Sequence, residues 1–138
     1  MQVQAYLHFD GHCEEALEFY RQALGAQIDM LMRYKDSPEP PPPGMVLPGM
    51  ADKVMHANLR IGESTIMASD DCTQTRVIHQ GFQLSLSAAN EAEAERCFSA
   101  LAEGGLVKMP LAKTFFSPCF GMLTDRFGVP WIVIVIAQ

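Results

Sequence analysis

The sequence has no basic cluster, no long hydrophobic segment and no closely spaced pair of cysteines. Its 138 residues include 10 Lys+Arg and 16 Asp+Glu, a net charge of −6, and this balance repels phosphate backbones and anionic lipid surfaces. The longest apolar run, 129–137, is much shorter than the roughly 20 residues of a membrane-spanning helix. We therefore expect neither nucleic acid nor a membrane as a partner.

The N-terminal residues and the cysteines indicate a cytoplasmic protein. The first residues have no basic region followed by a long apolar core, so no secretory signal is predicted. Cys13, Cys72, Cys97 and Cys119 form no CxxC pair, and this spacing favours neither a zinc knuckle nor a disulfide framework. We expect reduced thiols that mostly pack in the core.

Apolar spacing predicts two amphipathic helices. Residues 14–24 carry acids in the first turn and apolar side chains three or four positions apart, and Gly25 suits the left-handed position after a helix. Residues 91–101 repeat this pattern after Asn90, a favourable N-cap. The second helix is expected to end at Gly104.

Strand-like segments surround both helices in the same order. In chain order they are 6–9, 27–34, 54–61 and 64–69, followed by 82–87, 106–112, 119–124 and 130–136. A shift of 78 residues places Ala16 on Ala94 and Tyr20 on Phe98, which indicates an internal duplication. We predict an α+β fold with two βαβββ modules, about 1–70 and 81–138, paired as one domain with a ligand pocket between curved sheets.

Residues 35–52 interrupt the first module. They contain six of the nine prolines, including four in succession at 40–43, and such a run favours extended polyproline II structure. We predict a loop or lid that is mobile without ligand.

Six segments together form a recognisable set. They are YLHFDG at 6–11, CEEALEFY at 13–20, MRYKD at 32–36, DKVMHA at 52–57, TIMASD at 65–70 and GMLTDRFGVPW at 121–131. Nearly end to end, the chain resembles the PhnB-like branch of the glyoxalase/bleomycin-resistance superfamily. The resemblance implies the vicinal-oxygen-chelate fold, a cup-shaped mixed sheet of paired βαβββ modules, and usually a homodimer.

Catalytic members of that superfamily hold a divalent metal with His and Glu ligands. The corresponding strand positions here carry Ala5, Gln83 and Ile132, none of which is a good ligand. His56 and His8 are the only candidate metal ligands, and the cofactor is left unknown. Some members are named methyltransferases, but no glycine-rich strand-to-helix turn is present here to hold a nucleotide-like cofactor.

His56 is the strongest polar candidate. Alternation along strand 54–61 places His56, Asn58 and Arg60 on one face, where His56 is predicted to act as a general base, an anion donor or a metal ligand. The structural alternative is a histidine hydrogen-bonded to a neighbouring strand, and both interpretations stay open. For His8 we favour the parity that turns Leu7 inward and leaves His8 under the helix or at a dimer interface.

Further residues are predicted to line the pocket. Gln83 and Ser85 form a polar strand face, whereas Met67, Phe116 and Trp131 supply adaptable or flat apolar walls.

We therefore predict a cytoplasmic homodimer that binds a small organic molecule. One alternative is a metal-dependent lyase, transferase or dioxygenase-like enzyme, and another is a drug-sequestering protein of the resistance type.

Overall fold

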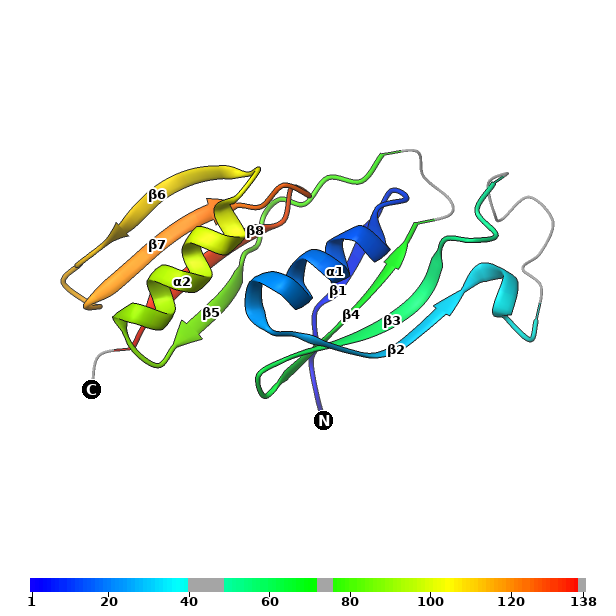
Figure 1. Ribbon diagram of the computed structural model, residues 1–138, viewed down its shortest axis with the longest axis horizontal. Helices are drawn as coiled ribbons and strands as arrows, with labels where there is room; N and C mark the ends of the chain where they lie inside the picture. Colours follow the sequence, from blue (N-terminus) through cyan, green and yellow to red (C-terminus); the bar gives the residue numbers. More distant parts are fainter. Residues whose placement is uncertain (40–48, 72–75, 137–138) are drawn as a thin grey trace. The chain divides into compact units, whose positions relative to one another are not determined.

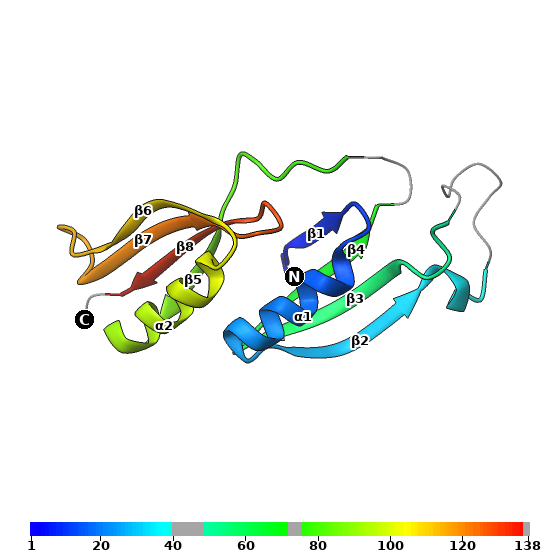
Figure 2. The same ribbon diagram turned by 45° about the horizontal axis from the view of Figure 1, so that its top comes forward.

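The computed structural model describes residues 1–39, 49–71 and 76–136 (Figure 1). The chain divides into two compact units, Met1–Val77 and Ile78–Gln138. Each unit is a four-stranded mixed sheet with one helix across one face, as Figures 1 and 2 show from two directions. The predicted pocket between the two units stays a prediction.

The N-terminal unit runs in the order strand, helix and three strands. Its elements are β1 (Tyr6–Phe9), α1 (Cys13–Leu24), β2 (Gln27–Arg33), a 3-10 turn at Tyr34–Asp36, β3 (Val54–Ile61) and β4 (Ser64–Asp70). The sheet order is β1-β4-β3-β2. The β1 and β4 strands pair in parallel, and the other neighbouring strands pair antiparallel.

The C-terminal unit repeats this order and sheet arrangement. Its elements are β5 (Leu84–Ala88), α2 (Glu91–Ala102), β6 (Leu106–Ala112), β7 (Cys119–Thr124) and β8 (Pro130–Val135). The strands lie in the order β5-β8-β7-β6, with β5 and β8 parallel. The repeated βαβββ order confirms the predicted α+β fold.

Helix ends follow the predicted signals. Gly25 has a φ of 69° in the left-handed region after α1, which glycine adopts without a Cβ clash. The Asn90 side chain accepts a hydrogen bond from the Glu93 amide at the start of α2. The second helix ends at Ala102, two residues before Gly104.

The duplication extends to the packing of the helices against the sheets. Ala16 and Tyr20 of α1 are fully buried, and their counterparts Ala94 and Phe98 of α2 are buried as well. Each helix therefore covers one sheet face, and each sheet has a second face that its own helix does not cover (Figure 2).

The proline-rich segment is closed at its base. The Tyr34 amide donates to the Lys53 carbonyl at 3.1 Å, and the Lys35 amide donates to the Ala51 carbonyl at 2.9 Å. Lys35 Nζ also lies 2.8 Å from Asp52 Oδ1. Residues 40–48, including the four successive prolines, lie outside the described residues, so the predicted mobility of this loop stays a prediction.

Across the described residues, every helix is too short or too polar to cross a lipid bilayer.

Candidate functional site

The face of the N-terminal sheet that α1 leaves open carries a group of linked polar side chains. Strand register places its members in two cross-strand rows. One row is Met30, Asn58, Met67 and Tyr6, and the other contains Met32 with His56 and Ser69 with His8. We name these eight residues the histidine face.

Tyr6 and His56 meet on the histidine face although β4 separates their strands. The Tyr6 hydroxyl lies 3.0 Å from Nδ1 of His56, and the two ring centroids are 5.5 Å apart. Tyr6 is 39% exposed, so this contact is within reach of a ligand.

Asn58 completes a chain of hydrogen bonds. Its Oδ1 lies 3.0 Å from Nε2 of His56. An amide oxygen only accepts, so this contact is satisfied when Nε2 of His56 bears the hydrogen. In the neutral imidazole, Nδ1 then accepts from the Tyr6 hydroxyl. The His56 side chain thus hydrogen-bonds on both sides, to a residue of its own strand and to one of β1, which is not adjacent to β3 in the sheet.

His8 lies on the histidine face as well. Its Nδ1 is 3.4 Å from the Ser69 hydroxyl, and its ring centroid is 5.0 Å from that of Tyr6. Leu7 and Phe9 are buried while Tyr6 and His8 are exposed. The placement of His8 under the helix is therefore wrong, because the strand is offset by one residue from the assumed parity. The alternative placement at a dimer interface stays a prediction.

These two histidines are not joined by further metal-binding groups. Among the described residues, no group of three His, Cys, Asp or Glu side chains is placed to hold a metal ion. His56 contacts a phenol and an amide, and His8 contacts a hydroxyl. The site therefore does not fit the three or four strong ligands that a divalent metal of this fold class needs.

Arg60 lies in the next row of the same face, opposite Thr65. Its Nε is 3.2 Å from Asp29 Oδ2, and its guanidinium also bonds to Gln27. Side chains of β2 therefore partly neutralise and hydrogen-bond the Arg60 guanidinium. Asn58, which was also predicted to bind a ligand, belongs to the hydrogen-bond chain.

The residues predicted in the C-terminal module separate onto two faces. Ser85 pairs with Ile132, and Leu84 pairs with Trp131, so Ser85 and Trp131 point to opposite sides. Gln83 donates to the Met122 sulfur at 3.3 Å. Phe116 is 46% exposed and packs edge-on against Phe120.

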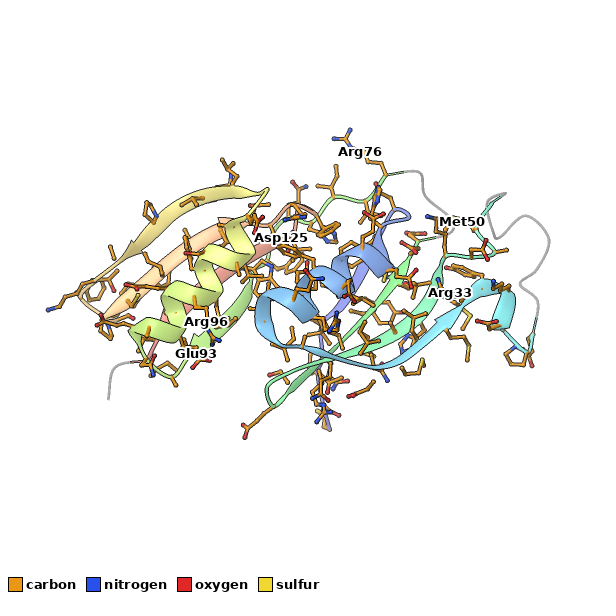
Figure 3. All side chains as sticks on the ribbon, in the orientation of Figure 1. Arg33, Met50, Arg76, Glu93, Arg96 and Asp125 are labelled. Carbon is orange, nitrogen blue, oxygen red and sulfur yellow. The ribbon has the colours of Figure 1, made fainter. Side chains whose placement is uncertain are left out.

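Trp131 belongs to the core of this module. It is only 3% exposed, and its indole nitrogen donates to Oδ2 of Asp125 at 2.9 Å. Asp125, labelled in Figure 3, also accepts from the Phe127 and Val129 amides. The prediction that Trp131 lines a ligand pocket is therefore wrong, because its indole is fixed by a buried carboxylate.

An ion pair at the first module was not expected from the sequence. Arg33, labelled in Figure 3, donates to both carboxylate oxygens of Glu14 at 3.0 and 2.7 Å and to the Asp52 carbonyl at 2.9 Å. The hydrogen bond from Arg33 lowers the pKa of Glu14. The pair ties the start of α1 to the base of the proline-rich segment, and no local sequence signal predicts a contact between residues 19 apart.

Comparison with known proteins agrees with this fold and its order of elements. Residues 1–134 match the 3-demethylubiquinone-9 3-methyltransferase family. The chain is 37% identical to Protein YjdN of Escherichia coli (strain K12) over 145 residues, covering 100% of this chain and 97% of YjdN.

The chain belongs to the PhnB-like branch of the glyoxalase/bleomycin-resistance superfamily.

Solved structures resemble this PhnB-like chain along its whole length. Protein PA1353 from Pseudomonas aeruginosa is 43% identical, with a TM-score of 0.87 and coverage of 100% and 99% of the two chains. The PhnB protein from Bacillus cereus is 28% identical, with a TM-score of 0.79 and coverage of 98% and 99%. A glyoxylase/bleomycin resistance protein/dioxygenase domain from Frankia sp. EAN1pec, 12% identical over 99% and 98% with a TM-score of 0.72, shares the fold.

The methyltransferase name of the PhnB-like family implies a methyl donor, and the β1–α1 turn tests whether a nucleotide-like donor fits there. The Gly11 and Cys13 amides at this turn both donate to Oδ1 of Asp70 at 2.9 Å. In a nucleotide-binding turn, such amides face the ligand. Here a buried carboxylate, 1% exposed, occupies them. This turn therefore does not fit a nucleotide-like donor.

Asp70 is buried although acids at a strand end are usually solvent-exposed. Its Oδ2 accepts from the Val54 amide at 2.9 Å, and the Tyr34 hydroxyl donates to the Asp70 carbonyl at 2.7 Å. Asp70 thus holds together β1, β3 and the helix entry.

Proposed function

We propose that this chain binds a small organic molecule on the histidine face. The observation that carries the proposal is the Tyr6–His56–Asn58 chain of hydrogen bonds on an accessible sheet face. A small number of polar side chains within reach of a ligand is what fixes the orientation of small molecules in binding sites.

The composition of the face suggests the character of the ligand. Tyr6, His8 and His56 supply a hydroxyl and two imidazoles, whereas Met32 and Met67 lie in the same rows. Thioethers are flexible and polarisable, and they pack well against aromatic groups. We expect a molecule with an oxygen-bearing polar end and a flat or apolar body.

Methyl NMR tests this proposal. Protein labelled with ¹³C at the methionine methyl groups is titrated with a library of small carboxylates, phenols and heteroaromatic compounds. We expect some compounds to shift the Met32 and Met67 signals and leave Met109 unchanged, because Met109 lies on the edge strand β6 of the other module. A library that moves none of the methionines on the histidine face contradicts the proposal.

The metal-dependent lyase, transferase or dioxygenase alternative receives less support. His56 and His8 would have to recruit further ligands beyond their present hydroxyl and amide partners. The drug-sequestering alternative is a binding function too, and cationic aromatic compounds in the same library distinguish it.

We also propose a homodimeric, cytoplasmic protein with no nucleic acid or membrane partner. The exposed apolar residues Leu106, Val107 and Met109 on edge strand β6 support self-association, because an edge strand with apolar side chains is usually covered. The buried free thiols of Cys13, Cys97 and Cys119 are in keeping with a reducing compartment.

A further inference from the structure

The hydrogen-bond chain on the histidine face has a direction. Asn58 Oδ1 accepts from Nε2 of His56, and Nδ1 of His56 accepts from the Tyr6 hydroxyl. The tyrosine hydroxyl has one hydrogen and two lone pairs. Because its hydrogen is directed to His56, its oxygen is left with lone pairs that can accept a hydrogen bond from a ligand.

We infer that Tyr6 and His56 together take a proton from an acidic hydroxyl group of the ligand, such as a phenol or an enol. This inference rests on the proposed function, because the ligand must occupy the histidine face. The ligand O–H bond breaks and its proton passes to the Tyr6 oxygen, while the proton of Tyr6 passes to Nδ1 of His56. The products are a ligand oxyanion, a neutral tyrosine and an imidazolium.

The partners of His56 suit this transfer. The Nε2–H group that donates to Asn58 in the neutral imidazole still donates in the imidazolium, so the chain needs no rearrangement. The transfer requires a ligand hydroxyl that is far more acidic than an alcohol. Phenols and enols with electron-withdrawing groups meet this condition, whereas simple alcohols do not.

The described residues around His56 supply no negative charge in contact with its ring, so the ligand oxyanion can balance the charge of the imidazolium. The β1 strand contributes Tyr6 and His8, with the exposed Asp10 just beyond it. The β4 and β2 strands contribute Ser69, Met67 and Met32, which are neutral. On β3, Arg60 is paired with Asp29 of β2. The hydrogen-bond partners of His56 are thus a hydroxyl and an amide, so the counter-charge for the imidazolium comes from the ligand. His8, beside the Tyr6 ring, is a second donor to that oxyanion.

The probe for this inference is 4-nitrophenol, whose ionised form absorbs visible light and whose neutral form does not. The probe is titrated into the intact protein at a pH below its own pKa, and absorbance gives the ionised fraction of the bound probe. We expect ionised probe on the wild-type protein. Tyr6→Phe and His56→Gln should each lower the ionisation constant of the bound probe by about tenfold, or one pKa unit.

Thr65→Val is the matched control. Thr65 lies opposite Arg60 in the next row of the same sheet face. It is not one of the eight residues of the histidine face, so this variant should ionise the probe as the wild type does. Circular dichroism spectra establish that each variant is folded. The ionisation of the probe by the wild-type protein tests the inference even when a variant does not fold.

Three results overturn the inference. The first is probe bound in its neutral form by the wild type. The second is ionisation of the probe by Tyr6→Phe and His56→Gln to the same extent as by the wild type. The third is no binding of 4-nitrophenol while other compounds shift the Met32 and Met67 methyl signals. None of these three results contradicts the proposed binding function. A library in which no compound shifts the Met32 and Met67 signals contradicts both the proposed function and the proton-transfer inference.

Discussion

Replacement of Asp70 by asparagine tests how the first module is held together. The carboxylate accepts three backbone N–H groups: Gly11 and Cys13 on Oδ1 and Val54 on Oδ2, each at 2.9 Å. Asparagine has nearly the same shape but only one acceptor oxygen. If that oxygen keeps Gly11 and Cys13, the amide NH₂ group faces the Val54 N–H, donor against donor.

The expected loss of stability follows from these bonds. An unpaired buried donor costs about 1–3 kcal/mol, and hydrogen bonds to a charged acceptor are stronger than those to a neutral one. The free energy of unfolding should therefore fall by about 2–4 kcal/mol. For a chain of this size, this corresponds to a decrease in Tm of about 10 °C.

Thermal and urea unfolding followed by far-UV circular dichroism measures this loss. Tryptophan fluorescence adds a second probe, because the chain's one tryptophan, Trp131, lies in the other module. Asp10→Asn is the control, since Asp10 is exposed and should change stability by less than about 0.5 kcal/mol. A Tm for Asp70→Asn within about 2 °C of the wild type would refute this account of the helix entry.

Three further predictions concern an ion pair, a close packing contact and assembly. Glu14→Gln should lower stability by about 0.2–1 kcal/mol near pH 7, because Glu14 is half exposed. The bond to Arg33 lowers the pKa of Glu14, so this contribution is present above the ordinary carboxyl pKa and should vanish as the pH falls through the lowered one; urea titrations at several pH values measure it. Gly121→Ala should cost about 1–3 kcal/mol in thermal unfolding, because its Cβ would lie 2.8 Å from Phe98 and 2.9 Å from Leu111. Light scattering at micromolar concentration should give the mass of a dimer, and a monomer would count against self-association.

Local patterns were enough to predict the fold. The strand limits Tyr6–Phe9, Val54–Ile61, Leu106–Ala112 and Cys119–Thr124 agree with the predicted ones, because alternation and turn residues are local signals. The β5 strand begins at Leu84, two residues later than expected, which is an ordinary error at a strand end. The element order depends on these signals alone, and it was predicted correctly.

The candidate site was less predictable. Alternation placed His56 and Asn58 on one face, but it could not fix the parity of the short β1 strand, so His8 was assigned to the wrong side. Trp131 was misplaced for a different reason. Its aromatic side chain suits a pocket wall and a core equally well, and only the contact with Asp125 decides between them. Contacts across strands and over long sequence separations leave no pattern in a single sequence.

The most direct test of a ligand site on the histidine face is the effect of His56→Ala on binding and on stability together. The ligand is a compound that shifts the Met32 and Met67 methyl signals, and its Kd is measured beside the Tm of both proteins. Because His56 lies on an accessible face, we expect Kd to rise by at least about tenfold, or 1.4 kcal/mol. The Tm should fall by no more than about 4 °C. A large fall in Tm with an unchanged Kd would contradict this account and would make His56 a structural residue.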